Sequence, residues 1–212
     1  MNPKEITVRR LTSFSQVETL YRSLLKKDFA PAELRPLSSL RRSWERNAYD
    51  CFGLFAADEL LGYAFFARLE KSYLLDYFAV AADRRGEGLG SLFLGRLTEI
   101  FRDADCVLCE VEDPDRASTP AERASREQRL RFYLRAHWRQ TGLRCMLFGV
   151  DYRLLELPAA GRHSAEELQA LYCALYRGLL PPYFFRTQFH PSRDRPPHSR
   201  FDKGGKEACW NS

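Results

Sequence analysis

The 212-residue chain has no apolar run that approaches the length of a membrane span, and its first residues, MNPKEITVRRL, lack the apolar core of a signal peptide. Its charges are nearly balanced, with 33 basic and 28 acidic residues, and no basic stripe is interleaved with aromatic residues. These absences argue against a membrane protein and give no reason to expect a nucleic-acid partner. We therefore expect a cytoplasmic protein with neither a nucleic-acid nor a membrane partner.

Cysteine and histidine give no sign of a disulfide framework or of a metal site. Most of the six cysteines lie in apolar surroundings, in a chain too long to need disulfide bonds for its stability. Cys106 and Cys109 have C-x-x-C spacing, but residues three apart on a strand point to opposite faces. The four histidines lack metal-ligand spacing. We expect reduced cysteines that pack in the core, and no metal cofactor.

The chain does contain enough apolar residues for a sizeable core, since 45% of it is hydrophobic and 13% aromatic. Up to residue 157 the patterns predict a strand, two helices, three strands, a helix, a strand, a helix and two strands, a mixed α/β layered domain. A last helix opens at Ser164, and Pro181-Pro182 is expected to stop it. The chain thus divides into a main domain (1–160), a C-terminal helical extension (161–190) and a disordered tail (191–212).

The most informative stretch is DYFAVAADRRGEGLG, which starts at Asp76. An apolar strand leads into a loop with Gly86, Gly88 and Gly90, and an amphipathic helix follows at once. The first N–H groups of a helix are unpaired and its dipole favours negative charge there, so this arrangement predicts an anion site. Glycine lets a phosphate approach the backbone closely. We expect a ligand that carries a phosphate or pyrophosphate.

The spacing Arg85-x-x-Gly88-x-Gly90 resembles the acyl-CoA signature [RQ]-x-x-G-x-[GA] of the GCN5-related N-acetyltransferase (GNAT) family. A Walker loop does not fit, because the chain has no Gly-Lys-Ser/Thr. A dinucleotide fingerprint would need a third glycine where Ser91 or Phe93 stands. Glu110 does lie near the position of a ribose-binding acid, so the dinucleotide hypothesis remains an alternative.

The predicted element order also matches this family over residues 5–157. The resemblance implies a GNAT-like mixed, mostly antiparallel central sheet flanked by helices, and a bacterial-type enzyme that moves acetyl from acetyl-CoA to a primary amine by direct attack. Acetyl-CoA would be a co-substrate. The resemblance implies that the cofactor binds to the strand end Phe78, Ala79 and Val80 and to the loop Arg85, Gly86, Glu87, Gly88, Leu89, Gly90 and Ser91.

A second resemblance lies in Arg131-Phe132-Tyr133-Leu134-Arg135-Ala136-His137-Trp138, which is similar to the family segment F-Y-[EK]-x-x-G-F. It implies that the hydroxyl of Tyr133 meets the sulfur of coenzyme A. A phenol with a pKa of about 10 can donate a proton or a hydrogen bond to a departing thiolate with a pKa of about 8.5. The chain departs from the pattern at His137 and Trp138, which stand for glycine and phenylalanine.

Attack by an amine calls for a base, and three carboxylates compete for the role. Glu110 lies on a strand segment similar to the one where several relatives carry their base, and Glu112 shares its strand face. Asp76 lies within an apolar strand, where a charge is costly unless it is paired or functional. We rank Asp76 and Glu110 equally and Glu112 lower, and several relatives use only ordered water.

These acids, together with Asp113 and Asp115, are expected to give the acceptor pocket a negative potential and a preference for a cationic amine. Arginines on the predicted helix 120–137 oppose this potential, although such a helix face is most often solvated and ion-paired.

Two other classes of function stay open at this stage. A non-catalytic module could bind acyl-CoA as a sensor or contact a partner protein, and the dinucleotide hypothesis would make the protein an oxidoreductase. For the enzyme, the acceptor could be a small amine, an antibiotic, a polyamine, a protein N-terminus or a lysine. A homodimer remains one option.

Overall fold

Eight strands form one sheet in the computed structural model, which describes residues 6–31, 33–157 and 162–193. Their spatial order is β1-β2-β3-β4-β5-β7-β6-β8, and every neighbouring pair is antiparallel except β4 and β5. The strands are β1 (Ile6–Arg10), β2 (Tyr49–Ala56), β3 (Glu59–Leu69), β4 (Ser72–Val80), β5 (Cys106–Glu112), β6 (Arg139–Leu147), β7 (Val150–Leu157) and β8 (Phe189–Arg193). The predicted mixed, mostly antiparallel sheet is confirmed.

Helices flank this sheet and begin where the capping signals indicate. Ser13, Thr119 and Ser164 each accept a hydrogen bond from a backbone N–H of the first turn that follows. A π-helical turn at Tyr21–Leu25 joins the first two helices. The helices are α1 (Phe14–Leu20), α2 (Lys26–Asp28), α3 (Leu37–Glu45), α4 (Leu89–Ile100), α5 (Pro120–Arg135), α6 (Ala165–Leu179) and α7 (Pro182–Gln188).

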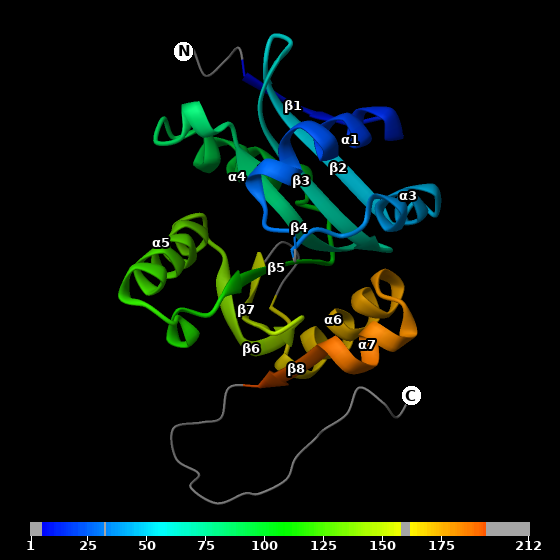
Figure 1. Cartoon of the computed structure of the whole chain (residues 1–212), viewed down its shortest axis with the longest axis vertical. Coiled ribbons are helices and arrows are strands. Elements are labelled where there is room, and N and C mark those ends of the chain that lie inside the picture. The colour runs from blue at the N-terminus through cyan, green and yellow to red at the C-terminus, as the bar shows by residue number, and fades with distance from the viewer. Residues whose placement is uncertain (1–5, 32, 158–161, 194–212) are drawn as a thin grey trace, which may run out of the picture.

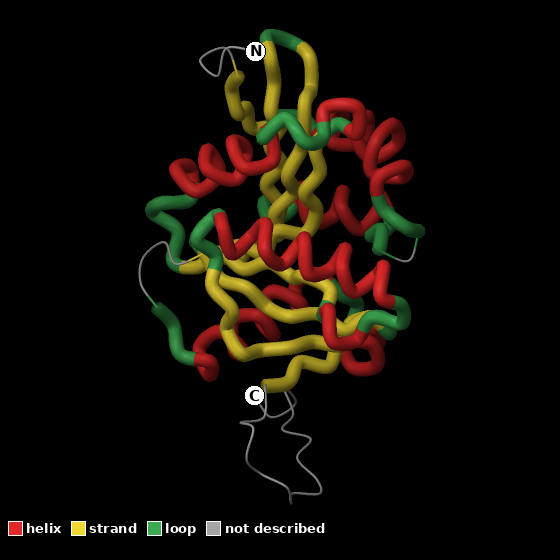
Figure 2. The backbone as a smooth tube through the Cα atoms, turned by 90° about the vertical axis from the view of Figure 1, so that its left-hand side faces the viewer, coloured by secondary structure: helices red, strands yellow, loops and turns green. Residues whose placement is uncertain are grey.

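Each face of the sheet carries its own hydrophobic cluster, because side chains alternate along a strand. Phe65 and Leu168 belong to the cluster under α1, α3 and α6, and we call this side the α6 face. Phe66, Phe93 and Leu130 belong to the cluster under α4 and α5, the α5 face. Figure 1 shows these two groups of helices on opposite sides of the sheet. In Figure 2 the first strands stand upright and the later strands cross below them, so the sheet is strongly twisted.

The sheet opens in its middle, between β4 and β5. These parallel strands pair only from Ser72–Cys106 to Leu75–Cys109 in the described part of the chain. Asp76 follows the last paired residue of β4, and Glu110 follows the last paired residue of β5. Asp76 is also the extra residue of a β-bulge against β3, which turns its side chain to the same face as that of the next residue, Tyr77. The two acids therefore stand at the mouth of one fork.

The C-terminal part is more ordered than the sequence predicts. Pro181-Pro182 ends α6 but also begins α7, because proline fits the first turn of a helix, where its missing N–H is not needed. The chain then pairs with β6 as β8, so residues 191–193 belong to a strand, and the expected tail boundary at 191 is corrected to follow Arg193. Residues 194–212 lie outside the described part of the chain. No helix among the described residues is long and apolar enough to cross a bilayer.

Candidate active site

The Gly-rich loop after β4 has the geometry of an anion site. Gly88 caps α4 with a φ of 79°, and no side chain of the described residues caps this helix end. A Cβ built on Gly86 or Gly88 would find no atom of the described residues within 4 Å. The first N–H groups of α4 therefore have no partner among the described residues, and they lie beside glycines whose left-handed backbone other residues rarely adopt. This confirms the predicted strand, loop and helix geometry, whereas binding of a ligand there stays a prediction.

The loop is also fixed against α5. A Cβ at Gly90 would lie 3.3 Å from the ring of Phe132, which precedes Tyr133. The ring of Phe132 in turn lies 6.0 Å from that of Phe78, centroid to centroid. Glycine at position 90 thus allows α4 and α5 to approach each other, and it links the predicted pyrophosphate loop to the helix that carries Tyr133.

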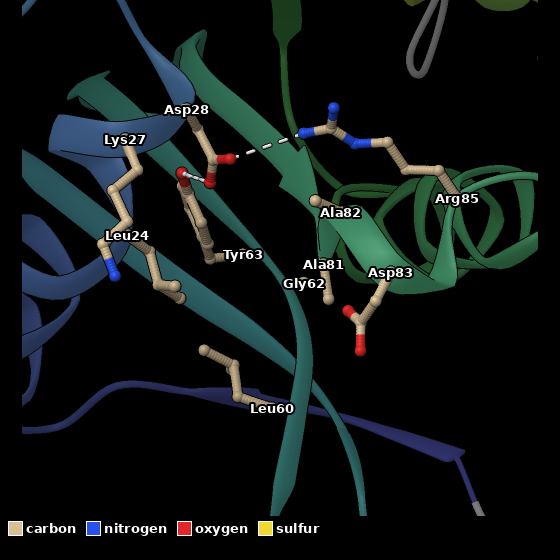
Figure 3. Close-up of a pocket in the computed structure, with 10 residues that line it drawn as sticks. All are labelled: Leu24, Lys27, Asp28, Leu60, Gly62, Tyr63, Ala81, Ala82, Asp83 and Arg85. Atoms are coloured by element: carbon tan, nitrogen blue, oxygen red, sulfur yellow. Dashed lines mark hydrogen bonds and ion pairs between the residues drawn. The ribbon is translucent and has the colours of Figure 1, made fainter.

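The arginines of the loop already have protein partners. Arg84 pairs with Glu87, with 2.9 Å between Nε and Oε1. Arg85 reaches Asp28 at 3.4 Å, and Asp28 also accepts a hydrogen bond of 2.7 Å from the Tyr63 hydroxyl. Figure 3 shows Asp28 between the Tyr63 phenol and the Arg85 guanidinium, in the wall of a cavity of about 410 Å³. Of the predicted site residues, Arg85 is the one that lines this cavity.

We expect Gly88→Glu to weaken acetyl-CoA binding by well over tenfold in calorimetry. The substitution puts a side chain and a negative charge where the helix N-terminus would meet pyrophosphate. Gly142→Glu is a matched control, because Gly142 also has a positive φ, 75°, and open space around it, but lies on β6. Unchanged affinity in a folded Gly88→Glu protein, or an equal loss in the control, would reject this loop as the cofactor site.

Asp76 is part of a buried ion pair rather than an isolated carboxylate. Arg35 donates to it over 2.7 Å from Nε, and the Tyr49 hydroxyl donates a second hydrogen bond to the same oxygen. Only 9% of the Asp76 side chain and 12% of the Arg35 side chain are exposed. Arg35 comes from the loop between α2 and α3 and was not among the predicted site residues. A charge opposite to that of Asp76 therefore lies directly on it.

The loop that carries Arg35 is fastened over the α6 face at several points. The backbone N–H of Arg35 donates to the Tyr77 hydroxyl over 2.8 Å, and its carbonyl accepts from the Tyr21 hydroxyl over 2.9 Å. Its guanidinium carbon lies 5.6 Å from the ring centroid of Tyr176 on α6. These contacts hold the guanidinium in place, so the pair with Asp76 has little freedom to open.

Glu110 lies on the same face as Asp76 but in a different environment. Its Oε1 accepts hydrogen bonds from the hydroxyls of Tyr172 and Tyr176, the second over 2.7 Å. Burial raises the pKa of Glu110, the two tyrosine hydrogen bonds lower it, and the net shift is upward. No salt bridge joins Glu110 to a cation among the described residues. The pKa of Glu110 therefore lies above the usual range of a glutamate.

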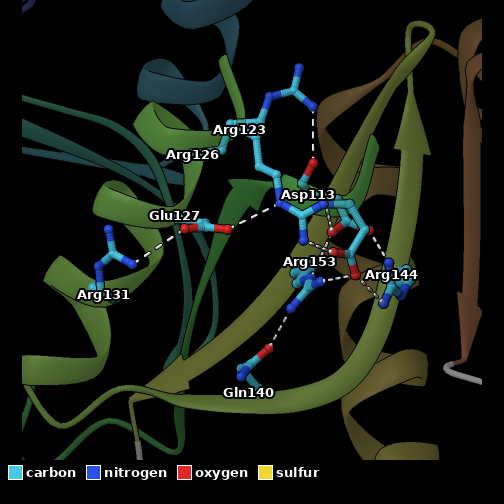
Figure 4. A network of polar contacts seen from close by, with 9 residues as sticks. Asp113, Arg123, Arg126, Glu127, Arg131, Gln140, Arg144 and Arg153 are labelled. Atoms are coloured by element: carbon cyan, nitrogen blue, oxygen red, sulfur yellow. Dashed lines mark hydrogen bonds and ion pairs between the residues drawn. The ribbon is translucent and has the colours of Figure 1, made fainter. Parts of the chain in front are cut away.

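The other acids that the sequence analysis grouped here are neutralised by arginines. Asp113 is buried and bonds Arg144 and Arg153, the latter over 2.7 Å, as Figure 4 shows. Glu112 pairs with two α5 arginines, at 3.3 Å and 2.8 Å. Asp115 lies 2.5 Å from Arg153. The expected negative potential of the pocket is therefore wrong for these three acids, because each lies in an ion pair. The arginines of α5 fit the solvated, ion-paired interpretation.

Tyr133 lies on the opposite, α5 face of the sheet. Its ring packs edge-on against Phe132 and Trp138, at centroid distances of 5.3 Å and 5.6 Å. Its hydroxyl has no hydrogen-bond partner among the described residues. Burial first and the nearby Cys109 thiol second raise the pKa of Tyr133, so its hydroxyl keeps its proton at neutral pH. The structure thus brings Asp76 and Glu110 together, and it places Tyr133 on the other side of the fork.

The cysteines of the C-x-x-C segment are buried and free, and they belong to different core clusters. Cys106 lies with Glu156 and His163 in a group whose candidate ligand atoms are within 4.8 Å of one another. The Glu156 carboxylate already forms an ion pair with Arg139, and its Oε1 lies 2.6 Å from Nδ1 of the His163 ring. Because Arg139 balances its charge, this group stands as an internal ion-pair network.

Comparison with known proteins supports the same fold. The ribosomal-protein-S18-alanine N-acetyltransferase of Escherichia coli aligns with a TM-score of 0.55 and 16% identity over 74% of this chain and 96% of its own. A protein from Bacteroides thetaiotaomicron assigned to the GNAT family aligns with a TM-score of 0.59 and 21% identity, over 81% of this chain and 94% of its own. A Bacillus subtilis acetyltransferase in complex with CoA aligns with a TM-score of 0.50 and 17% identity, over 72% of this chain and 97% of its own.

A comparison with curated proteins gives no match. The match to a family model is decisive: residues 17–123 fit the model of the acetyltransferase (GNAT) family. This segment runs from α1 through the Gly-rich loop and the fork into the start of α5. Because it spans half of the 212 residues, the chain belongs to the acetyltransferase (GNAT) family.

Proposed function

We propose that this acetyltransferase moves the acetyl group of acetyl-CoA to a primary amine by direct attack. The observation that carries the proposal is the fork between β4 and β5. It opens directly after Leu75 and Cys109, beside the free N-terminus of α4 on one side and Glu110 on the other. A thioester lying in this fork would be reachable from both faces of the sheet.

The cofactor is proposed to bind through backbone groups. The N–H groups of residues 85–91 would bind the pyrophosphate at the start of α4. Beyond Leu75, the edge of β4 that faces β5 has no ladder partner in the described chain, and the backbone of Phe78, Ala79 and Val80 would pair with the pantetheine arm along this edge. The Val80 carbonyl also accepts a hydrogen bond of 3.4 Å from Nε of Arg85. A backbone N–H there would also stabilise the negative charge that develops on the thioester oxygen.

Glu110 is the better of the two candidate bases. Asp76 is held in a buried ion pair by Arg35, and Arg35 and the Tyr49 hydroxyl both donate to the same Asp76 oxygen. Glu110 instead has a raised pKa and only neutral hydrogen-bond donors on its Oε1. An acceptor enters as an ammonium, and Glu110 would take its proton so that the nitrogen lone pair can attack the carbonyl carbon. Asp76 would instead hold Arg35 and its loop over the acceptor side.

Tyr133 would serve the departing sulfur from the opposite face. When the C–S bond breaks, the electron pair stays on sulfur as a thiolate, which then takes up the second proton that the nitrogen loses as the amide forms. Since burial raises the pKa of Tyr133 further above that of a thiol, a hydrogen bond from its hydroxyl fits better than complete proton transfer. The unpartnered hydroxyl is available for that bond. The base and the donor would thus act on the two sides of one thioester.

Both small amines and protein N-termini fit this proposal. The ribosomal-protein-S18-alanine N-acetyltransferase of Escherichia coli, which shares the fold, suggests peptides with free N-termini as acceptors to test. The proposal is tested with acetyl-CoA and a panel of acceptors: a polyamine, an aminoglycoside, a lysine peptide and peptides with free N-terminal residues. Release of thiol together with a mass increase of one acetyl group on the acceptor supports it. Tight binding of acetyl-CoA without transfer to any acceptor would instead support an acyl-CoA sensor.

A further inference from the structure

We infer that α6, which lies outside the segment that matches the family model, is part of the catalytic machinery, because Tyr172 and Tyr176 are positioning residues for Glu110. The inference rests on the proposed role of Glu110 as the base. Both hydroxyls converge on one oxygen of this carboxylate, from a helix that begins more than fifty residues after β5 ends. The remaining oxygen, Oε2, has no hydrogen-bond partner among the described residues and on this proposal would meet the acceptor ammonium.

The two phenols are held rigidly enough to fix that carboxylate. They lie four residues apart on α6 and so share one helix face. Tyr172 is 1% exposed and Tyr176 is not exposed at all. The Tyr176 ring stacks on Phe189 of β8 at 4.5 Å and 22°, and Tyr172 meets the same ring at 5.1 Å. The strand β8 therefore locks the helix that holds the base.

Other charged and titratable groups also face Glu110, and their effects partly cancel. Asp76 on β4 raises the pKa of Glu110, and Arg35 from the loop before α3 lowers it. Cys145 on β6 and Tyr152 on β7 interact with Glu110 from the remaining strands, and burial keeps both protonated. Arg35 is itself neutralised by Asp76. Burial has the largest effect on the pKa of Glu110 and disfavours its charged form. The two α6 hydroxyls have the next largest effects, and they stabilise the carboxylate.

The sequence carries a signal for this arrangement that only the fold explains. In the apolar face of α6, which includes Leu168, Leu175 and Leu179, two tyrosines stand at a four-residue spacing. A buried tyrosine hydroxyl needs a hydrogen-bond partner. Here both hydroxyls donate hydrogen bonds to the same carboxylate. These bonds offset the cost of burying the two hydroxyls and the cost of burying Glu110.

The direct test is a carbon-13 NMR titration of protein labelled at the glutamate side-chain carboxyls, with the Glu110 signal assigned by its loss in Glu110→Gln. Tyr172→Phe and Tyr176→Phe keep the rings and remove one donor each. We expect each to raise the pKa of Glu110 by about one pH unit, since a hydrogen bond to a charged group is of that size. Tyr183→Phe is the control, because this α7 tyrosine is 69% exposed.

The second readout is the pH dependence of turnover. Since Glu110 must be unprotonated to accept a proton, its acidic limb in kcat/KM should move to higher pH in both variants, while the KM for acetyl-CoA stays constant. A Glu110 titration that does not move in either folded variant overturns the inference. If the pKa of Glu110 shifts in the NMR titration but the acidic limb of kcat/KM stays in place, the result overturns the role of Glu110 as the base instead. Absence of turnover in the unmodified protein with every acceptor would count against the proposed function, and the NMR result would still decide the hydrogen bonds.

Discussion

Glu110→Gln should lower turnover by a factor of about 10² to 10⁴, the usual contribution of a general base, with little change in acetyl-CoA affinity. The amide keeps the shape of the side chain and can still accept hydrogen bonds from Tyr172 and Tyr176 through its oxygen. It cannot take a proton from the acceptor ammonium. Steady-state kinetics of thiol release, with calorimetry of acetyl-CoA binding, measure both quantities on the same protein.

The control for this prediction is Asp76→Asn. That change removes the charge opposite Arg35 and leaves a buried guanidinium uncompensated, so its main effect should be on the free energy of unfolding. Its kcat/KM should retain the acidic limb that Glu110→Gln abolishes. If the two variants exchange these behaviours, Asp76 is the base and the ion pair must open during the reaction. If both keep full turnover, ordered water takes the proton.

Tyr133→Phe should keep the fold and the acetyl-CoA affinity and lower kcat by about ten- to a thousandfold, because one donor to the departing thiolate is lost. The hydroxyl has no partner among the described residues, so its removal leaves no other group unpaired. The ring contacts with Phe132 and Trp138 remain. Stopped-flow or steady-state thiol release, compared with the thermal unfolding midpoint, separates a catalytic loss from a structural one.

Tyr73→Phe provides the comparison for Tyr133→Phe. Tyr73 lies on β4, packs against the same hydrophobic cluster on the α5 face and contacts the ring of Phe101 at a tilt of 51° and a centroid distance of 4.5 Å, away from the fork end of the strand. Both changes remove one hydroxyl. Equal rates for the Tyr133→Phe protein and the unmodified protein would take Tyr133 out of the mechanism, and an equal loss in both variants would point to a change in the α5 face.

The features of the fold that local sequence dictates were predictable. A capping serine or threonine followed by a glutamate or glutamine needs only its own first turn, and Ser13, Thr119 and Ser164 begin their helices as expected. The Gly-rich loop is equally local, since Gly88 has the positive φ that its helix start requires. The split of Cys106 and Cys109 between the two faces follows from strand periodicity alone.

What the sequence could not predict depends on partners far along the chain. Asp76 and Glu110 are similar as strand acids, and the difference between them comes from Arg35, 41 residues before Asp76, and from Tyr176, 66 residues after Glu110. The bulge at Asp76, which places Tyr77 on the same face as Asp76, is set by the register against β3, not by a local motif. Pro182 was ambiguous because proline both ends and begins helices, and only the continuation into β8 shows that it begins one.

The short ladder between β4 and β5 has a consequence for stability as well as for the site. The strands β1–β4 and β5–β8 form two antiparallel halves, and the sheet crosses from one to the other through four residue pairs, from Ser72–Cys106 to Leu75–Cys109. Among the strand pairs of the described residues, this seam has the fewest paired residues. A cofactor lying in the fork would form hydrogen bonds with the free edge of β4 and contact β5. It would thereby connect the two halves of the sheet. By thermodynamic linkage, a bound cofactor raises the free energy of unfolding of the enzyme, and this gain grows with the logarithm of the cofactor concentration. The added bonds lie between β4 and β5, where the backbone hydrogen bonds of the sheet are fewest.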